Sequence, residues 1–392
     1  MQSSPGLSPS CVIRPVQSRR DLKRFIQFPY DLYRGNPFWV PPLRTDQLET
    51  LNPRKNPFFK HGRMQLFLAL DANGAVVGRI AGIINGMHLK TYADDVGFFG
   101  FFETQENYEI AEALLDAAAS WLQEQGMQII RGPVNPSLND TSGLLVDGFD
   151  RVPSIMMAYN PPYYEDYLYR WGYYRVMTLW AYYIHRKHVT MERLRRGASI
   201  VRRRNPGVSL RTLDMSRFDE EVTTIREIFN EAWSDNWGFV PATDQEFSHM
   251  ACAMKQIVDP RMCFFVEMDG KPVGFTITLP DINPALQRLP NGRLLPLGLL
   301  KLLILTKFAK VRELRMPLMG IRKAYHGRAL DVLPVLETIE KSTDYGYHAC
   351  ETSWVLDDNH VMKNLLNSIH AVVDKEYAIL EAPIRAGINV SD

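Results

Sequence analysis

Residues 313–329 read ELRMPLMGIRKAYHGRA, and this stretch decides the fold. Its first half is short and apolar, as in a buried strand, and its second half is basic and contains Gly327. A helical pattern follows over residues 330–341. A strand, a basic turn and a helix often hold a pyrophosphate, because N–H groups at the helix start and the helix dipole attract an anion. An ordinary turn with a solvated basic surface is the alternative interpretation.

A second apolar strand follows and ends in polar residues. Residues 351–359 read ETSWVLDDN, and a helix is expected over residues 362–369. In this order of elements, the chain resembles the GCN5-related N-acetyltransferase superfamily over roughly residues 210–380. In that superfamily a strand leads into a pyrophosphate loop of the type Arg/Gln-x-x-Gly-x-Gly/Ala, and the next strand ends near an Asn.

The resemblance places Arg322, Gly327 and Ala329 in the pyrophosphate loop and Asn359 at the Asn. The spacing from Arg322 to Gly327 is longer than in the common loop, and Leu366 stands where a Tyr often serves as general acid. The resemblance implies coenzyme A as cofactor, with acyl-CoA as donor. The residues expected to bind it are Met319, Gly320, Ile321, Arg322, His326, Gly327, Arg328 and Ala329.

The implied reaction is transfer of an acyl group from a thioester to an amine. It needs a base for the ammonium, an N–H donor for the oxyanion and a proton for the thiolate, but no metal. The candidates for these roles are Glu351, Asp357, Asn359 and Tyr325, with His326 and Tyr377 as further acids. Each candidate carboxylate is also typical of an ordinary loop or helix cap.

Length and composition bound the remaining classes of function. A chain of 392 residues favours two domains, and its net charge of +1 gives no support to nucleic-acid binding. The four cysteines show no metal spacing, and residues 1–10 resemble a disordered tail and not a secretory signal. We therefore expect a cytoplasmic protein without a metal.

The sequence repeats itself at an offset close to 200. The NPFWVP motif that begins at Asn36 matches NWGFVP at Asn236, and hairpin patterns follow both copies. Further along, the offset is 220. There the matched pairs are Gly100 with Gly320, Gly126 with Gly346, and Asn139 with Asn359. This repeat predicts two tandem copies of one mixed-sheet α/β unit. The resemblance implies that each copy has an acyl-CoA N-acyltransferase fold.

We expect residues 11–187 to form a degenerate first copy, 188–206 a basic linker, and 207–385 the copy that binds acyl-CoA. In the first copy, the loop at residues 102–108 has no Gly and carries Glu103 and Glu106, which would repel a phosphate. The linker is expected to be a solvated connector, with a site for an acidic partner as the alternative.

The amine acceptor is expected to meet polar and aromatic loop residues on this scaffold. The candidates are Asn236, Trp237, Phe239, Asn135 and Asn139. A structural role for the long Gly/Pro/Asn loop of the first copy is the alternative. With the tandem layout, the NWGFVP motif resembles a bacterial group of acyltransferases. Some members of that group N-acylate long-chain amino-alcohols to give ceramide-like lipids.

The second copy also has an insertion of about twenty residues that is rich in leucine at positions 294–308. It is too short to span a bilayer, so core packing, a lid over an acyl-chain pocket and a peripheral contact with the inner membrane compete. We expect an N-acyltransferase that prefers long acyl chains and a sphingoid-type amine. The alternatives are a small-molecule N-acetyltransferase and a non-catalytic acyl-CoA-binding scaffold. An aminoacyl-tRNA-dependent transferase is disfavoured by the neutral charge.

Overall fold

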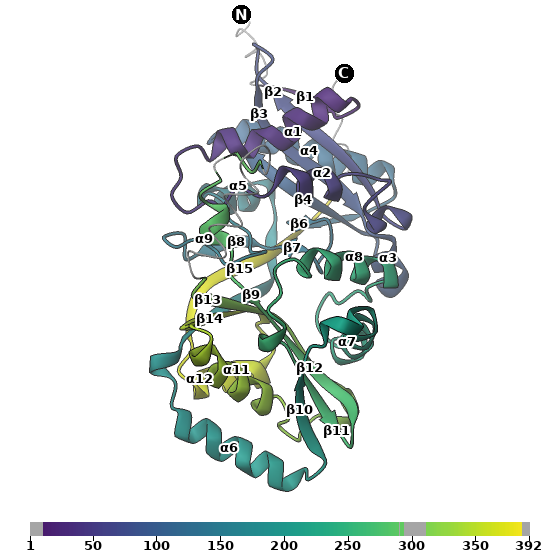
Figure 1. The fold of residues 1–392 in the computed structure, drawn as a ribbon. Coiled ribbons are helices and arrows are strands. Elements are labelled where there is room, and N and C mark those ends of the chain that lie inside the picture. Colours follow the sequence, from purple (N-terminus) through teal and green to yellow (C-terminus); the bar gives the residue numbers. More distant parts are fainter. Residues whose placement is uncertain (1–10, 290, 294–310, 386–392) are drawn as a thin grey trace, which may run out of the picture. The chain divides into compact units, whose positions relative to one another are not determined.

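The computed structural model describes residues 11–289, 291–293 and 311–385 (Figure 1). Backbone contacts divide the chain into two α/β units. The first contains residues 11–177, 291–293 and 378–385, and the second contains residues 178–289 and 311–377. The expected α/β class and the two units are therefore present. The apolar run at residues 294–308 lies outside the described residues.

The first unit has a mixed sheet in the order β1-β2-β3-β4-β5-β15. Its strands are β1 (Val12–Pro15), β2 (Arg63–Leu70), β3 (Val76–Ile84), β4 (Val96–Thr104), β5 (Ile129–Gly132) and the end of β15 (Val372–Pro383). The helices and short helical turns are α1 (Arg19–Leu32), α2 (Arg44–Thr50), η1 (Pro57–Lys60), α3 (Gly86–Tyr92), α4 (Tyr108–Glu124) and α5 (Tyr163–Trp171). Three short strands follow β5, namely β6 (Val134–Asn135), β7 (Thr141–Ser142) and β8 (Leu144–Asp147).

Alternation along β2 explains how this sheet is covered on both faces. Phe67 and Ala69 belong to the apolar cluster built with α4, whereas Leu68 and Leu70 belong to the cluster built with α1. Successive side chains of a strand point to opposite faces, so a run that is apolar at every position fits a strand between two helical layers.

The second unit repeats this plan in the order β9-β14-β13-β12-β11-β10. Its strands are β9 (Tyr174–His185), which begins in the first unit, β10 (Val208–Thr212), β11 (Phe264–Met268), β12 (Lys271–Pro280), β13 (Glu313–Ile321) and β14 (Ala349–Leu356). Its longer helices are α6 (Met191–Arg204), α7 (Phe218–Ala232), α8 (Asp244–Met254), α11 (Val332–Asp344) and α12 (His360–Ser368). Shorter elements are η2 (Arg186–His188), η3 (Met215–Arg217), η4 (Pro260–Met262), α9 (Asn283–Leu286) and η5 (Lys323–Tyr325).

The internal repeat is confirmed at corresponding elements. Gly126 and Gly346 end α4 and α11 with φ angles of 88° and 83°, a conformation that favours glycine. The next strands, β5 and β14, both run parallel to the strand that precedes the helix. Among the described residues, no helix is long and apolar enough to cross a bilayer.

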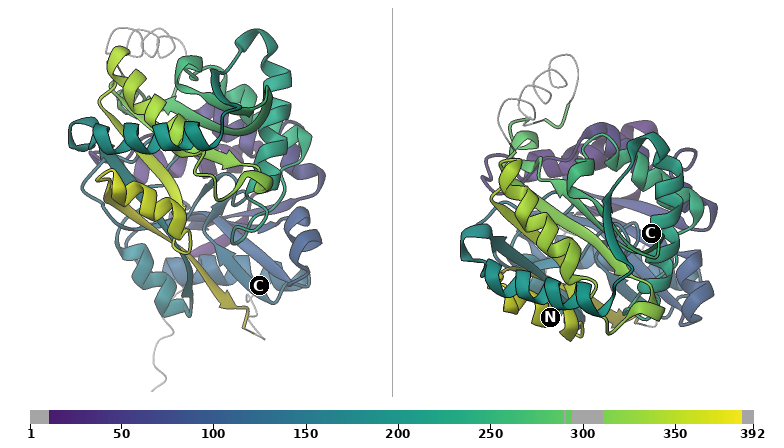
Figure 2. Two further views of the ribbon diagram at one scale, coloured as in Figure 1. Left: turned by 90° about the horizontal axis from the view of Figure 1, so that it is seen from below. Right: turned by 60° about the horizontal axis from the view of Figure 1, so that its bottom comes forward.

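The division between the units differs from the one expected from the repeat, because the last strand of each expected copy pairs with a strand of the other copy. The end of β15 pairs with β5 and completes the first unit, whereas Leu179 to His185 of β9 pair with β14 in the second. The segment expected as a linker, 188–206, forms α6, which lies along α11 (Figure 2). Its apolar side, Leu194, Ala198 and Val201, is buried in the core of the second unit.

In both units the backbone pairing between the two central parallel strands stops before the strands end. Pairing of β4 with β5 stops at Phe98, although β4 continues to Thr104. Pairing of β13 with β14 stops at Met316 and Thr352, although both strands continue. In β13 the next residue is Pro317, which has no N–H to donate to a ladder.

The first unit closes its opening with its own backbone. The Phe101 N–H donates to Asn135 Oδ1 at 2.6 Å, and the carbonyl oxygen of Val134 lies where a side-chain carbon on Gly100 would be. At the corresponding Gly320, the three nearest atoms to such a carbon belong to the side chains of Ala232 and Phe275, at 3.2 Å or more. Only the first unit therefore has backbone against this glycine.

We expect Gly100→Ala to lower the free energy of unfolding by about 3 kcal/mol, the upper end of the usual cost of overpacking, because the new methyl group overlaps a buried carbonyl. The matched change Gly320→Ala should cost about 1 kcal/mol or less, since a methyl group must yield by only a few tenths of an ångström. Urea denaturation of both variants tests this difference. Equal losses would show that the two openings are filled alike.

Candidate functional site

The turn that follows β13 leads to the start of α11 through two residues in the left-handed backbone conformation. After the short helix η5, Gly327 and Ala329 have φ angles of 76° and 55°. No atom lies within 4 Å of a side-chain carbon placed on Gly327. Such a turn suits glycine at Gly327 for conformational reasons and leaves open space beside it.

Carboxylates of α7 and the residues after it neutralise the first two cations of the turn. Arg322 pairs with Glu231 at 2.7 Å and with Glu227 at 3.4 Å. Lys323 donates its backbone N–H to Glu231 at 3.0 Å and its ammonium to Asp235 at 2.7 Å. The bond from Lys323 lowers the pKa of Asp235. These pairs attach the turn to α7 and reduce the charge that Arg322 and Lys323 could offer to a ligand.

The charge that stays available lies at the other end of the turn. Arg328 is exposed, with its guanidinium 5.1 Å from the centre of the Tyr325 ring, and it has no carboxylate partner in the described part of the chain. The ring of His326 lies 2.8 Å from the carbonyl oxygen of Ile321. Asp331, which stands at the start of α11, has its pKa raised by burial. Within the described residues, the arginine of this turn that has no carboxylate partner therefore lies among residues 327–329.

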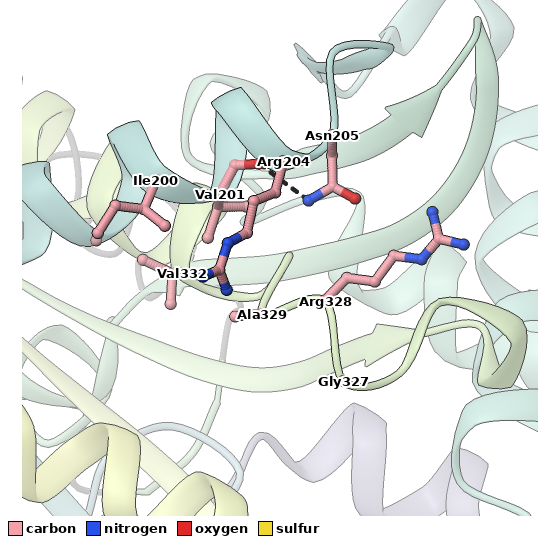
Figure 3. A pocket seen from close by; sticks show the side chains of 9 residues that line it. Ile200, Val201, Arg204, Asn205, Gly327, Arg328, Ala329 and Val332 are labelled. Atoms are coloured by element: carbon pink, nitrogen blue, oxygen red, sulfur yellow. Dashed lines mark hydrogen bonds between the residues drawn. The ribbon is translucent and has the colours of Figure 1, made fainter.

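These three residues line a pocket of about 490 Å³ together with α6 and the first turn of α11 (Figure 3). The lining residues are Gly197, Ile200, Val201, Arg204, Asn205, Gly327, Arg328, Ala329 and Val332. The pocket is basic, since both charged residues in its wall are arginines. The loop expected to hold a pyrophosphate therefore opens into a cavity, as a ligand site requires.

A buried polar cluster lies at the point where β13 and β14 part. Arg315 and Glu351 are register partners, and they are only 3% and 2% exposed. Ser353 donates to Glu351 at 2.6 Å and accepts from Arg315 Nε at 3.1 Å. Burial lowers the pKa of Arg315, although the negative charge of Glu351 acts in the opposite direction. The pKa of Tyr377 is raised, mainly by burial and to a smaller extent by the charge of Glu351. Glu351 is thus held by neighbours, and this arrangement fits a role in shaping the opening.

Asp357 lies at the end of β14 and is also engaged. Its Oδ1 accepts from Trp180 Nε1 and from the ammonium of Lys363, both at 2.8 Å. These two bonds, that from Lys363 first, lower the pKa of Asp357. A carboxylate with a lowered pKa is a weaker base, so the geometry favours Asp357 as an anchor for the start of α12 over a proton acceptor.

Asn359 caps α12, because its Oδ1 accepts from the Met362 N–H at 3.1 Å. Its amide N–H₂ takes no part in that bond. Tyr325, the remaining candidate acid, is half-buried in η5 under the Arg328 guanidinium. The structure therefore places Tyr325 in the turn after β13 and Asn359 at the end of the neighbouring strand.

The NWGFVP motif follows α7 in the second unit. The ring centre of Phe239 lies 5.5 Å from that of Phe229, and Asn236 donates its backbone N–H to the Trp233 carbonyl. Trp233 in turn donates its Nε1–H to the carbonyl of Met319 at 2.9 Å. Trp237 lies within the same motif and is half-buried. Trp233, which sequence reasoning did not single out, connects this motif to the end of β13.

The first-unit candidates have structural partners of their own. Asn135 closes the opening beside β4, and the Asn139 N–H donates to Ser137 Oγ at 3.2 Å. Glu103 lies in β4 and not at a helix start, and it accepts from the hydroxyls of Tyr33 and Tyr164 at 2.6 and 2.9 Å. Burial raises the pKa of Glu103. These contacts use the polar groups of the first unit within its own core.

No protein-family model matches the chain. The chain is 37% identical over 389 residues to protein YghO of Escherichia coli (strain K12), with 98% of each chain covered. It is 36% identical over 376 residues to a bacterial ceramide synthase of Caulobacter vibrioides (strain NA1000 / CB15N), covering 94% of this chain and 96% of that one. A solved tandem GNAT (GCN5-related N-acetyltransferase) protein from the clavulanic acid biosynthesis pathway is 12% identical. It matches 96% of this chain and 99% of its own at a TM-score of 0.58. The expected tandem acyltransferase fold is thus confirmed.

We expect Asn359→Ala and Asn359→Asp to separate capping from any role of the amide. The first removes the cap and should lower the free energy of unfolding by about 1 kcal/mol, whereas Asp still caps. If the amide N–H₂ borders the reacting group, both variants lose turnover with acyl-CoA. Full turnover in a stable Asn359→Asp variant would limit Asn359 to capping.

Proposed function

Because the chain belongs to the same family as protein YghO and the bacterial ceramide synthase of Caulobacter vibrioides, we propose that it is an acyl-CoA-dependent N-acyltransferase. The acceptor is a primary amine of the sphingoid type, a long-chain amino-alcohol, and the donor carries a long acyl chain. The observation that carries this proposal is that β13 and β14 stop pairing before they end. Beyond that point, β13 continues into a glycine-bearing turn that lines a basic pocket.

The residues of the second unit fit coenzyme A by their chemistry. Gly327 allows close approach of the backbone, the first turn of α11 favours an anion, and Arg328 offers a charge that no described carboxylate neutralises. Coenzyme A would supply the activated thioester. Residues 319–321 of β13 would hold the pantetheine arm, since beyond Met316 this strand no longer pairs with β14.

The acceptor amine must lose a proton before it attacks the thioester. Asp357 is ionised and accessible but already binds Lys363 and Trp180, whereas Glu351 is enclosed beside Arg315. Either carboxylate would act through water. Tyr325 lies in the turn that would hold the pyrophosphate, under the Arg328 guanidinium, so it is at the wrong end of the pantetheine arm to protonate the leaving thiolate.

Two observations support a lipid acceptor over a small polar amine. One is the 36% sequence identity to the ceramide synthase, which extends over 94% of this chain and 96% of that one. The other is the leucine-rich composition of residues 294–308, read from the sequence alone. A non-catalytic acyl-CoA-binding protein is the second candidate, favoured by Leu366 at the position of the usual acid.

We expect one coenzyme A site per chain, and Arg328→Glu should weaken binding by at least about tenfold because it places a like charge beside the pyrophosphate. The matched control is Glu106→Gln in the exposed loop of the first unit, which should leave affinity unchanged. Isothermal titration calorimetry measures both quantities. Two equal sites per chain would contradict the proposal.

We expect catalytic efficiency to rise from acetyl-CoA to dodecanoyl-CoA and beyond with a long-chain amino-alcohol as acceptor. Each methylene buried in an apolar site contributes about 0.8 kcal/mol before binding costs are subtracted. Release of free thiol reports turnover across a series of donors and acceptors. Highest efficiency with acetyl-CoA and a small polar amine would indicate a small-molecule acetyltransferase. Tight binding without turnover of any pair would indicate the scaffold alternative.

A further inference from the structure

Helix α6 has one side in the core of the second unit and its C-terminal end at the turn expected to hold a pyrophosphate. Leu194, Ala198 and Val201 are buried against α11, whereas Arg204 and Asn205 line the pocket beside residues 327–329. Figure 3 shows the Arg204 side chain extending from α6 toward Ala329 and Val332. The helix therefore provides one wall of the pocket, and the turn provides the other.

The arginines of the pocket differ in pairing from their neighbours. Arg195, earlier on α6, pairs with Glu340 of α11 at 2.7 Å, and Arg322 pairs with two carboxylates of α7. Within the described residues, neither Arg204 nor Arg328 forms an ion pair. Two arginines in one cavity, without a carboxylate between them, are an arrangement that suits an anionic ligand.

A glycine in the wall gives an independent indication that the space is used. Gly197 lies in the middle of α6, where glycine is less favourable than alanine by roughly 0.5–1 kcal/mol. A side-chain carbon at this position would meet only Val332 Cγ1, at 3.9 Å, which is an ordinary contact. Packing inside the protein therefore does not require glycine here. Because Gly197 has no side chain, the pocket is wider at this position.

We propose that this pocket binds the adenosine 3′-phosphate end of coenzyme A, and that Arg204 recognises the 3′-phosphate. The inference rests on the proposed function, since it concerns the part of the donor that lies beyond the pyrophosphate. Ile200 and Val332 offer apolar surface for the adenine, and Arg204 offers a fork of donors for the phosphate. The volume of about 490 Å³ falls within the range of about 300–1,000 Å³ found for small-molecule sites.

This assignment gives α6 a role in the choice of donor. Acyl groups on carrier proteins are attached to 4′-phosphopantetheine, which has no adenosine and no 3′-phosphate. A pocket that recognises the 3′-phosphate therefore favours free acyl-CoA over an acyl carrier protein. The basic connector between the copies is then part of the donor site at its C-terminal end.

The test compares dodecanoyl-CoA with dodecanoyl-3′-dephospho-CoA in the full-length protein, by catalytic efficiency and by the affinity of the corresponding free thiols. The wild-type protein should prefer the 3′-phosphorylated form by about tenfold or more, the usual effect of one charge-assisted contact. Arg204→Gln should bring this ratio close to one, because the amide that replaces the guanidinium offers no charge to the 3′-phosphate. Arg204→Lys should restore part of the preference.

The matched control is Arg203→Gln, one residue away, exposed and outside the pocket lining. It should keep the wild-type ratio. A ratio that is the same in Arg204→Gln and in the wild-type protein overturns the inference and leaves the proposed function standing, provided that the wild-type protein uses acyl-CoA. If the wild-type protein neither binds nor uses any coenzyme A thioester, the proposed function fails, and the inference fails with it.

Discussion

Beyond Met316 and Thr352, β13 and β14 no longer exchange backbone hydrogen bonds, and the candidate site depends on this loss. Backbone N–H and C=O groups inside a protein need partners, so unpaired strand segments at the centre of a sheet are stable only if something else satisfies them. Pro317, directly after the last pair, removes one donor from the ladder. The turn after β13 is then held in place by ion pairs to α7 and by the Trp233 bond to Met319.

The two units differ in what occupies the space beside these unpaired strand segments. In the first, Asn135 supplies the missing acceptor to Phe101, and the Val134 carbonyl lies against Gly100. In the second, the corresponding glycine is surrounded by side chains, and the turn beside it opens into a basic pocket. This difference between the two units is the basis of the proposed single acyl-CoA site.

Local patterns in the sequence were sufficient to predict much of the fold. The strand, turn and helix around Gly327, and the glycines that end α4 and α11, depend on neighbouring residues and could be predicted. The exchange of β9 and β15 could not, because strand pairing over such distances leaves no local signal. The arginines of α6 suggest a solvated linker, whereas the spacing of Leu194, Ala198 and Val201 indicates a buried helix side.

The basic turn after β13 could be predicted from the sequence, but the balance of charges around it could not. The resemblance implies that Arg322 contacts the ligand, whereas carboxylates about ninety residues earlier in the chain neutralise it. Only a tertiary structure shows which cations remain for a phosphate.

Hydrogen exchange measured with and without a non-hydrolysable acyl-CoA analogue shows whether acyl-CoA binds the second unit alone, because it reports on both units in one experiment. We expect slower exchange at residues 319–332 and 197–205, with no change at residues 98–104 and 133–137 of the first unit. Protection of both sets, or of the first-unit residues alone, would contradict this expectation.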